Sequence, residues 1–181
     1  MTAAIPRNGH DGNQDGGHEH GAPYQPVFVG ARRQELDELF TKYPTKMACL
    51  LPALWIVQDE RGWVSEEAIA EVAQILDLTP AYVKGVVTFY TMYNQHPVGK
   101  YLIQVCTTSP CNVCGAENVV GAFLQQTGCG ELGVTSADGK YTVIEVECLG
   151  ACGFATPVMI NEGFVESVTP EKVPQILAGL D

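Results

Sequence analysis

The sequence predicts a mixed α/β fold, in which a small helical bundle comes first and a separate α/β domain follows. Three observations predict it. Residues 31–93 hold four helical segments with apolar periodicity, joined by short loops. Beyond Gly99 the pattern changes to short β-type runs that alternate with helices. The chain has 181 residues, 46% of them hydrophobic, which is enough for one sizeable core or two small ones.

We expect three parts along the chain. Residues 1–26 are rich in Gly, Asn, Asp, His and Pro and hold almost nothing to bury, which predicts a disordered tail. Residues 27–95 should form the helical domain, and residues 96–181 the α/β domain. The boundary between the two lies where the helical periodicity stops.

Two helical segments open the bundle. ARRQELDELFTKY (31–43) places its apolar side chains on one face, and Pro44 ends it. KMACLLPALWIVQDERG (46–62) is apolar nearly all round at its centre, which predicts the buried helix of the bundle. Because Pro52 lies inside this segment, we expect a kink or a break there.

Two capped helices complete the bundle. SEEAIAEVAQILD (65–77) starts at Ser65, whose hydroxyl can accept a hydrogen bond from a free backbone amide. TPAYVKGVVTFYTMY (79–93) starts at Thr79, with proline at the first helical position. We expect Trp55, which lies in segment 46–62, to be in the core. We expect the same of the aromatic residues of TFYTMY (88–93), which end segment 79–93.

The α/β domain begins with a strand, a helix and a second strand. KYLIQVC (100–106) is a short β-type run. GAENVVGAFLQQTG (115–128) has helical periodicity, with Gly128 as its C-terminal cap. YTVIEVEC (141–148) alternates apolar and polar residues as a strand does.

The end of the chain predicts a hairpin and a last helix. PVMIN and FVESV flank Glu162–Gly163, which is a hairpin signal. TPEKVPQILAGL (169–180) predicts a helix, and Pro174 leaves its exact start open. The resulting order, β–α–β–β–α with room for one more short strand around 131–135, is typical of a thioredoxin-like α/β domain.

Composition limits where the chain works and what it binds. No apolar run approaches the roughly 20 residues that span a bilayer, and the start lacks the apolar stretch of a secretory signal. We therefore expect a soluble intracellular protein without a disulfide framework. The formal net charge is −11, and residues 101–181 hold two Lys/Arg against nine Asp/Glu. Such a surface repels phosphate backbones, so it disfavours nucleic acid and suits a basic protein partner.

Five of the seven cysteines lie in two short runs, VCTTSPCNVC (105–114) and CLGAC (148–152). Cys106 and Cys148 each end a predicted strand. If these strands are parallel neighbours, both thiols emerge at the same rim of the sheet, where ligand sites form in open α/β sheets. Cys111 then lies near a helix start, where free amides and the helix dipole favour the thiolate.

Four thiolates in two pairs predict a [2Fe–2S] cluster, which takes two thiolates on each iron. Our preferred ligands are Cys106, Cys111, Cys148 and Cys152, as a C-x4-C and a C-x3-C pair. The plant-type ferredoxin spacing C-x4-C-x2-C is also present and would use Cys114 in place of Cys152. We prefer the first set because Cys114 falls in the run that predicts the amphipathic helix.

Other interpretations of the cysteines stay open. Structural zinc also accepts four thiolates, and CNVC (111–114) supplies the C-x2-C of a dithiol oxidoreductase. A chance cluster of buried cysteines is the plain structural alternative. We expect Cys49 to be a core residue of the second helix and Cys129 a loop thiol.

The motifs VCTTSPC, IEVECLGACG and QDERGWVS…VVTFYTMY resemble those of the thioredoxin-like [2Fe–2S] subunits of NADH:quinone oxidoreductase, respiratory complex I. The resemblance runs from about residue 31 to 180. It implies a helical domain ahead of a thioredoxin-like [2Fe–2S] ferredoxin domain, with ligands at the same four cysteines as our preferred set. Two positions depart from the family pattern: Cys114 is an extra cysteine, and Thr156 stands where Ala-Pro is expected.

The resemblance also implies a function. The chain would be an iron–sulfur electron-transfer subunit that exchanges single electrons with the flavin of an NADH-oxidising partner subunit. FMN and NADH would bind that partner, because this chain has no GxGxxG or other nucleotide motif. It would belong to an NADH dehydrogenase without a catalytic residue of its own, bound to further peripheral-arm subunits. The location would be cytoplasmic, peripheral to the inner membrane, with no direct membrane insertion.

Two rival functions stay open at this point. The first is the equivalent diaphorase subunit of an NAD-linked hydrogenase or formate dehydrogenase, since the electron-transfer chemistry is shared. The second is a stand-alone thioredoxin-like disulfide reductase that uses Cys111 and Cys114. For the cluster itself we expect a low reduction potential, because Glu145 and Glu147 adjoin the site and no cation is near.

Overall fold

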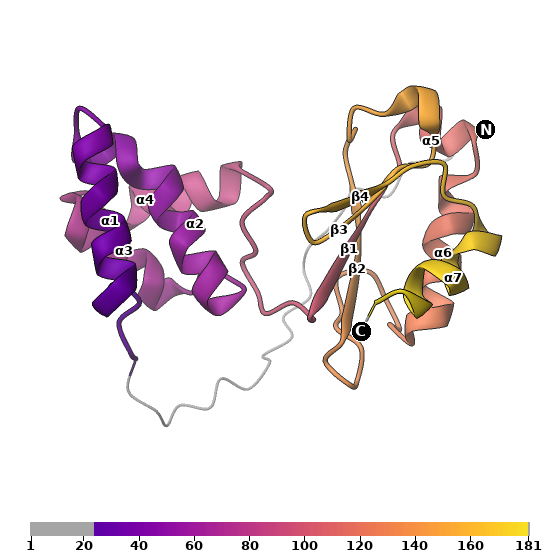
Figure 1. Cartoon of the computed structure of the whole chain (residues 1–181), viewed down its shortest axis with the longest axis horizontal. Coiled ribbons are helices and arrows are strands. Elements are labelled where there is room, and N and C mark those ends of the chain that lie inside the picture. Colours follow the sequence, from indigo (N-terminus) through magenta and orange to yellow (C-terminus); the bar gives the residue numbers. More distant parts are fainter. Residues whose placement is uncertain (1–23, 181) are drawn as a thin grey trace, which may run out of the picture.

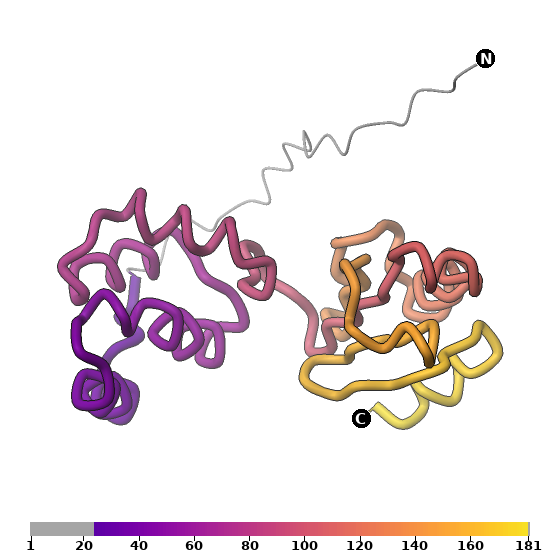
Figure 2. Tube along the Cα trace, turned by 90° about the horizontal axis from the view of Figure 1, so that it is seen from above, coloured from indigo at the N-terminus to yellow at the C-terminus, as the bar shows by residue number. Residues whose placement is uncertain are grey.

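The computed structural model describes residues 24–180 of the chain. Figure 1 shows two lobes, a helical one that holds α1–α4 and a mixed one that holds the sheet β1–β4. Seen from above in Figure 2, the two lobes are joined by a single extended stretch of chain before β1. The predicted tail lies, except for residues 24–26, outside the described residues.

The helical lobe follows the predicted order. Its elements are α1 Gly30–Lys42, the 3₁₀ turn η1 Lys46–Cys49, α2 Leu50–Arg61, α3 Glu66–Leu76 and α4 Pro80–Phe89. Both predicted N-caps are confirmed: the side chain of Ser65 accepts from the backbone N–H of Ala68, and that of Thr79 accepts from Tyr82.

The second helix differs from the prediction at its start. The predicted segment 46–62 is broken two residues before Pro52, since the turn η1 ends at Cys49 and α2 begins at Leu50, and Pro52 lies in the first turn of α2, where no intrahelical bond is lost. The residues before it form the 3₁₀ turn η1. The α4 helix ends at Phe89, so the predicted segment 79–93 is helical only in its first part.

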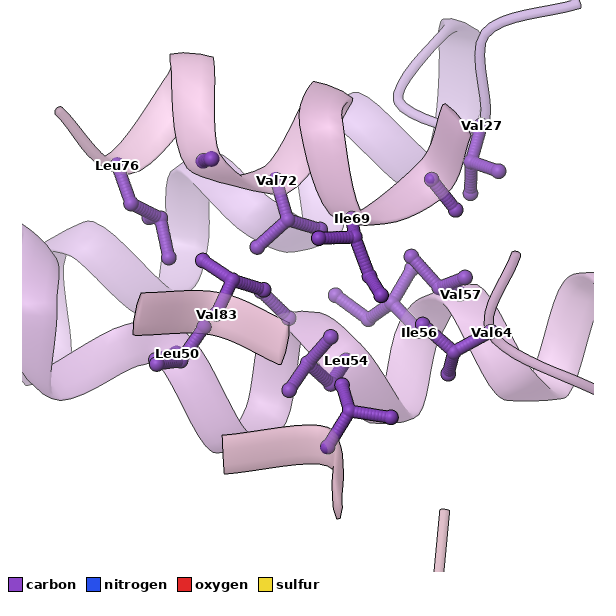
Figure 3. Packing of buried hydrophobic residues seen from close by; sticks show 14 of the residues in the cluster. Val27, Leu50, Leu54, Ile56, Val57, Val64, Ile69, Val72, Leu76 and Val83 are labelled. Carbon is purple, nitrogen blue, oxygen red and sulfur yellow. The ribbon is translucent and has the colours of Figure 1, made fainter. Parts of the chain in front are cut away.

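Apolar side chains from all four helices fill the helical lobe. Figure 3 shows Leu54, Val57, Val72 and Val83 meeting between the helices, and each is at most 1% exposed. A separate apolar cluster fills the mixed lobe. The lobes therefore have independent cores.

Several apolar residues of the helical lobe lie outside its core, contrary to our prediction. Trp55 is 39% exposed, Phe89 76% and Met92 46%. Leu51 on α2 is also exposed, so α2 is not buried on every side. The prediction is wrong for Trp55 and Phe89, but it is confirmed for Tyr93, which is 2% exposed in the helical core, and Tyr90 packs against the same core.

The mixed lobe contains a four-stranded sheet in the order β2-β1-β3-β4. The strands are β1 Tyr101–Cys106, β2 Tyr141–Val146, β3 Val158–Ile160 and β4 Gly163–Val165. β1 runs parallel to β2 and antiparallel to β3, and β3 and β4 form the predicted hairpin. Residues 131–135 add no strand; Thr135 makes one isolated bridge to Thr142.

Helices cover the sheet and close its core. They are α5 Ser109–Val113, α6 Ala116–Thr127 and α7 Val173–Ala178, with the 3₁₀ turns η2 Cys152–Phe154 and η3 Pro170–Lys172. α6 packs against β1, β2 and α7 (Figure 1). Phe123 of α6 is fully buried in the apolar cluster that holds Ile103, Val143 and Val158. This packing fixes the rim of the sheet from which the cysteine loops emerge.

Candidate metal centre

The parallel pairing of β1 and β2 brings the two cysteine loops to one rim of the sheet. In the register of this pair, Cys106 lies opposite Val146, the last residue of β2. Cys148 follows two positions later, so it lies in the loop and not at the strand end as predicted. The predicted neighbouring, parallel strands are confirmed.

The first pair of thiols is buried. Cys106 and Cys111 are each 1% exposed, and their sulfurs are 3.3 Å apart. The hydroxyl Oγ1 of Thr108 lies 3.1 Å from the sulfur of Cys106. Ser109 and Pro110 begin the short helix α5, which delivers Cys111 from its first turn.

The second pair of thiols is exposed. The sulfurs of Cys148 and Cys152 are 3.6 Å apart. The backbone N–H of Gly150 donates to the sulfur of Cys148 at 3.4 Å. Gly150 has φ of 80°, a left-handed conformation that glycine adopts without strain, and it turns the loop back so that Cys152 meets Cys148.

The two loops contact each other. Leu149, between the second pair, packs against Cys106 and Cys111. Its backbone N–H also hydrogen-bonds to the sulfur of Cys106. The two cysteine loops are therefore in contact at this rim of the sheet.

Protonation differs within the buried pair. Burial, followed by the hydrogen bond to Cys106, raises the pKa of Cys111 to about 12. Burial also works against ionisation of Cys106, but hydrogen bonds from Thr108 and from the Leu149 backbone outweigh it and lower its pKa. Cys106 is thus the readier thiolate of the pair, and Cys111 is the thiol that donates to it.

In the exposed pair, too, the pKa of one cysteine depends on its partner. The pKa of Cys152 is raised, first by its hydrogen bond with Cys148 and then by the charge on that neighbour. Electrostatic repulsion from Cys106, on the other loop, adds to the shift. A metal binds cysteine as the thiolate, so its binding at these residues would release their protons.

The sulfurs form two close pairs and not one compact group. Within residues 24–180, no three or more His, Cys, Asp or Glu side chains are grouped so that they could hold a metal ion. The sulfurs are instead arranged as two pairs from two loops, and a [2Fe–2S] cluster takes two thiolates on each iron. Amides and a hydroxyl already donate to these sulfurs.

The other three cysteines lie elsewhere. Cys49 is fully buried in the helical core, as predicted. Cys129 is buried, and its sulfur lies 3.4 Å from the carbonyl oxygen of Tyr141. Cys114 is exposed and ends the short helix α5, so our prediction that it falls within the amphipathic helix is wrong. Gly115 separates it from α6.

Sequence reasoning missed one functional group at this site, the backbone N–H of Leu149. A leucine between two cysteines carries no polar side chain that would mark it as a partner of sulfur. The only signal is the glycine that follows, because Gly150 permits the backbone to turn and aim its amides at a ligand.

Comparisons with known proteins match most of the chain. The family model described as "Thioredoxin-like [2Fe-2S] ferredoxin" matches residues 36–181. The chain is 40% identical over 156 residues to NADH-quinone oxidoreductase subunit 2 of Thermus thermophilus, covering 84% of this chain and 86% of that one. It is 38% identical over 151 residues to an NADH-quinone oxidoreductase subunit of Pseudomonas aeruginosa, covering 83% and 90%.

A solved structure shares the fold. It is an NAD+-reducing [NiFe]-hydrogenase in the air-oxidized state, matched with a TM-score of 0.62 at 20% sequence identity. The match covers 72% of this chain and 22% of that one. At this identity the likeness concerns the fold alone.

Proposed function

Since the chain belongs to the thioredoxin-like [2Fe–2S] ferredoxin family, we propose that Cys106, Cys111, Cys148 and Cys152 hold one [2Fe–2S] cluster. The chain is then an iron–sulfur electron-transfer subunit of an NADH:quinone oxidoreductase, an enzyme complex whose relatives at 38–40% identity carry that name. The observation that supports the proposal is that two close thiol pairs follow the ends of two parallel, neighbouring strands.

The chain's own residues would do three things at this site. The cysteine thiolates would bind iron, two from each loop. The Thr108 hydroxyl and the N–H groups of Leu149 and Gly150 would donate to ligand sulfurs and so stabilise negative charge there. The burial of Cys106 and Cys111 would exclude water from the inner side. When bound, the cluster supplies one-electron transfer.

The site opens to solvent on the side of the second loop. Cys148 and Cys152 are exposed, and Phe154, two residues further on, is 57% exposed. On the first loop Val113 is 89% exposed. An electron partner would therefore approach from the side of the second loop, where the apolar side chain of Phe154 is available for contact.

We propose that the partner is the flavin- and NADH-binding subunit of the same complex. The absence of a nucleotide-binding motif in this sequence supports placing FMN and NADH on another chain. The acidic charge of residues 101–181 favours a partner with a basic surface. Further peripheral-arm subunits would hold the assembly at the cytoplasmic face of the inner membrane. Among residues 24–180, every helix is too short or too polar to cross a bilayer.

Two other functions have less support. An NAD-linked hydrogenase or formate dehydrogenase could use the same module, and only the neighbouring subunits would separate these assemblies. A stand-alone disulfide reductase would need Cys111 and Cys114 to react together. Cys111 is instead buried against Cys106, whereas Cys114 is exposed at the end of α5, which argues against that chemistry.

Anaerobic purification and native capture test the proposal. We expect the purified chain to contain about two iron and two sulfide and to give a [2Fe–2S] electron paramagnetic resonance signal on reduction. Capture from the source membrane should recover a flavoprotein together with quinone-reductase subunits. Hydrogenase or formate dehydrogenase subunits would instead support the alternative assembly. A colourless protein that reduces insulin would contradict the proposal.

A further inference from the structure

One hydroxyl beside the metal centre has no partner. Within residues 24–180, Thr156 Oγ1 is the one buried side-chain oxygen or nitrogen that makes no hydrogen bond. Thr156 is 1% exposed, so water does not reach it from the surface. Leaving a buried hydroxyl unsatisfied costs about 1–3 kcal/mol. A group of this kind calls for an acceptor that the folded chain itself does not supply.

The position of Thr156 points to where that acceptor lies. Its neighbour on one side, Ala155, packs against the buried thiols Cys106 and Cys111. On the other side, the carbonyl oxygen of Pro157 accepts from the backbone N–H of Cys106 at 3.3 Å. Both residues next to Thr156 in the chain therefore contact the buried cysteine pair, which forms the inner side of the proposed metal centre.

The backbone of Thr156 is fixed, so its side chain cannot easily move away. Its carbonyl oxygen accepts from the N–H of Val168 at 2.9 Å, and Val158, two residues on, begins β3 in the core. Because this strand pairs antiparallel with β1, the position of Thr156 follows from the same sheet that places Cys106. The backbone of Thr156 is therefore held in place next to residues that contact the buried thiols.

Most of the hydrogen-bond acceptors at the proposed metal centre would be sulfurs. Four thiolates and the two inorganic sulfides of a [2Fe–2S] cluster would carry negative charge, and hydrogen bonds to charged acceptors are stronger than neutral ones. The Thr108 hydroxyl already lies 3.1 Å from the sulfur of Cys106 on the first loop. A second hydroxyl close to the buried thiols would have the sulfurs of the bound cluster as available acceptors.

We propose that the hydroxyl of Thr156 donates a hydrogen bond to a sulfur of the bound cluster, which makes Thr156 a positioning residue that favours the reduced state. The proposal rests on the function proposed above. A donor to sulfur stabilises the more negative, reduced form more than the oxidised one, so it raises the equilibrium constant for reduction. Thr156 would thus offset part of the effect of the acidic surroundings.

Three variants test this inference in the full chain loaded with its cluster. Thr156→Val keeps the shape and removes the hydroxyl, and Thr156→Ser keeps the hydroxyl. Thr127→Val is the matched control, because Thr127 is also buried in this lobe but already donates to the carbonyl oxygen of Phe123 at 2.7 Å. Reduction is followed by electron paramagnetic resonance during a redox titration, and iron and sulfide are counted in each sample.

We expect Thr156→Val to lower the equilibrium constant for reduction about threefold to tenfold, as loss of one charge-assisted hydrogen bond would. Thr156→Ser and Thr127→Val should stay within about twofold of the parent chain, on the same reasoning. A fully loaded Thr156→Val chain that reduces like the parent would overturn the inference, as would an equal shift in Thr127→Val. A parent chain without iron and sulfide would instead contradict the proposed function.

Urea unfolding of the chain without its cluster gives a second measurement, in which loss of the Thr156 hydroxyl should not be unfavourable. Without the cluster the hydroxyl is an unpaired buried group, so Thr156→Val should leave resistance to urea equal or higher. A Thr156→Val chain that is destabilised equally with and without cluster would show a merely structural threonine and overturn the inference. If Thr156→Val and Thr156→Ala both fail to load, loading of Thr156→Ser supports the inference, and failure of all three overturns it.

Discussion

Gly99 precedes β1, and a methyl group at this position would collide with the start of β2. A Cβ built on Gly99 lies 2.8 Å from the backbone N and C of Tyr141 and 2.9 Å from the carbonyl carbon of Lys140. The Gly99 N–H also donates to Oγ1 of Thr142 at 2.7 Å, and Thr142 is 1% exposed. Since these are backbone atoms, the two strands themselves must shift.

The substitution Gly99→Ala should therefore destabilise the mixed lobe by about 2–4 kcal/mol. Overpacking accounts for about 1–3 kcal/mol, and loss of the buried hydrogen bond for about 1 kcal/mol. Because β1 and β2 carry the two cysteine loops, the cluster should be released at a lower urea concentration than in the parent chain. Gly121→Ala is the control: it lies in α6 with open space at its Cβ position, so it should stabilise by about 0.5–1 kcal/mol.

Urea unfolding of the loaded chains measures both quantities. Visible circular dichroism of the cluster follows the mixed lobe, and far-ultraviolet circular dichroism follows both lobes together. Since the two lobes have separate cores, only the transition that includes the cluster signal should move. A Gly99→Ala chain as resistant as Gly121→Ala would refute the packing argument that sets the β1–β2 register.

Four further changes have clear expected outcomes. Burial raises the pKa of Tyr93 from 10.0 to about 12. The neutral side chain therefore contributes its full stabilisation below about pH 10, the pKa in the unfolded chain, and this contribution is lost between about pH 10 and 12. Tyr93→Phe should remove that alkaline loss in urea titrations while costing about 1 kcal/mol at pH 7, because its hydrogen bond to Leu51 is gone. Glu71→Ala removes the carboxylate that accepts hydrogen bonds from the N–H groups of Val27 and Phe28. Limited proteolysis near residue 27 should therefore become faster, and unchanged cleavage would show that Glu71 does not hold this segment in place. Phe89→Ser, at a 76% exposed side chain, should leave urea stability within about 0.5 kcal/mol but weaken capture of the flavoprotein partner; equal capture would show that this surface is not the contact. Glu147→Gln, at an exposed carboxylate beside Cys148, should raise the reduction potential only slightly, since solvent screens the charge, and a large rise would contradict that reasoning.

Local signals predicted most of the secondary structure. Ser65 and Thr79 mark helix starts because their hydroxyls satisfy free amides, and the structure confirms both caps. The alternation in 141–148 and the hairpin at Glu162–Gly163 also appear, as β2 and as the β3–β4 turn. These predictions succeed because neighbours along the chain decide them.

Tertiary packing decided what the sequence could not show. Trp55 and Phe89 look like core residues by type, yet within the part of the chain that the structure describes they are 39% and 76% exposed. Cys114 looked helical because the run 115–128 is helical, but the chain first makes the separate turn of α5. The unpaired state of the Thr156 hydroxyl depends on which groups surround it, and no local pattern encodes that.

Iron and sulfide content of seven single Cys→Ala variants tests the four-thiolate centre most directly. The pairing at one rim of the sheet predicts that removal of a proposed ligand abolishes the native cluster; these ligands are Cys106, Cys111, Cys148 and Cys152. Variants at the other three cysteines should keep about two iron and two sulfide per chain; these are Cys49, Cys114 and Cys129. Loss of the cluster in Cys114→Ala together with its retention in Cys152→Ala would contradict the account.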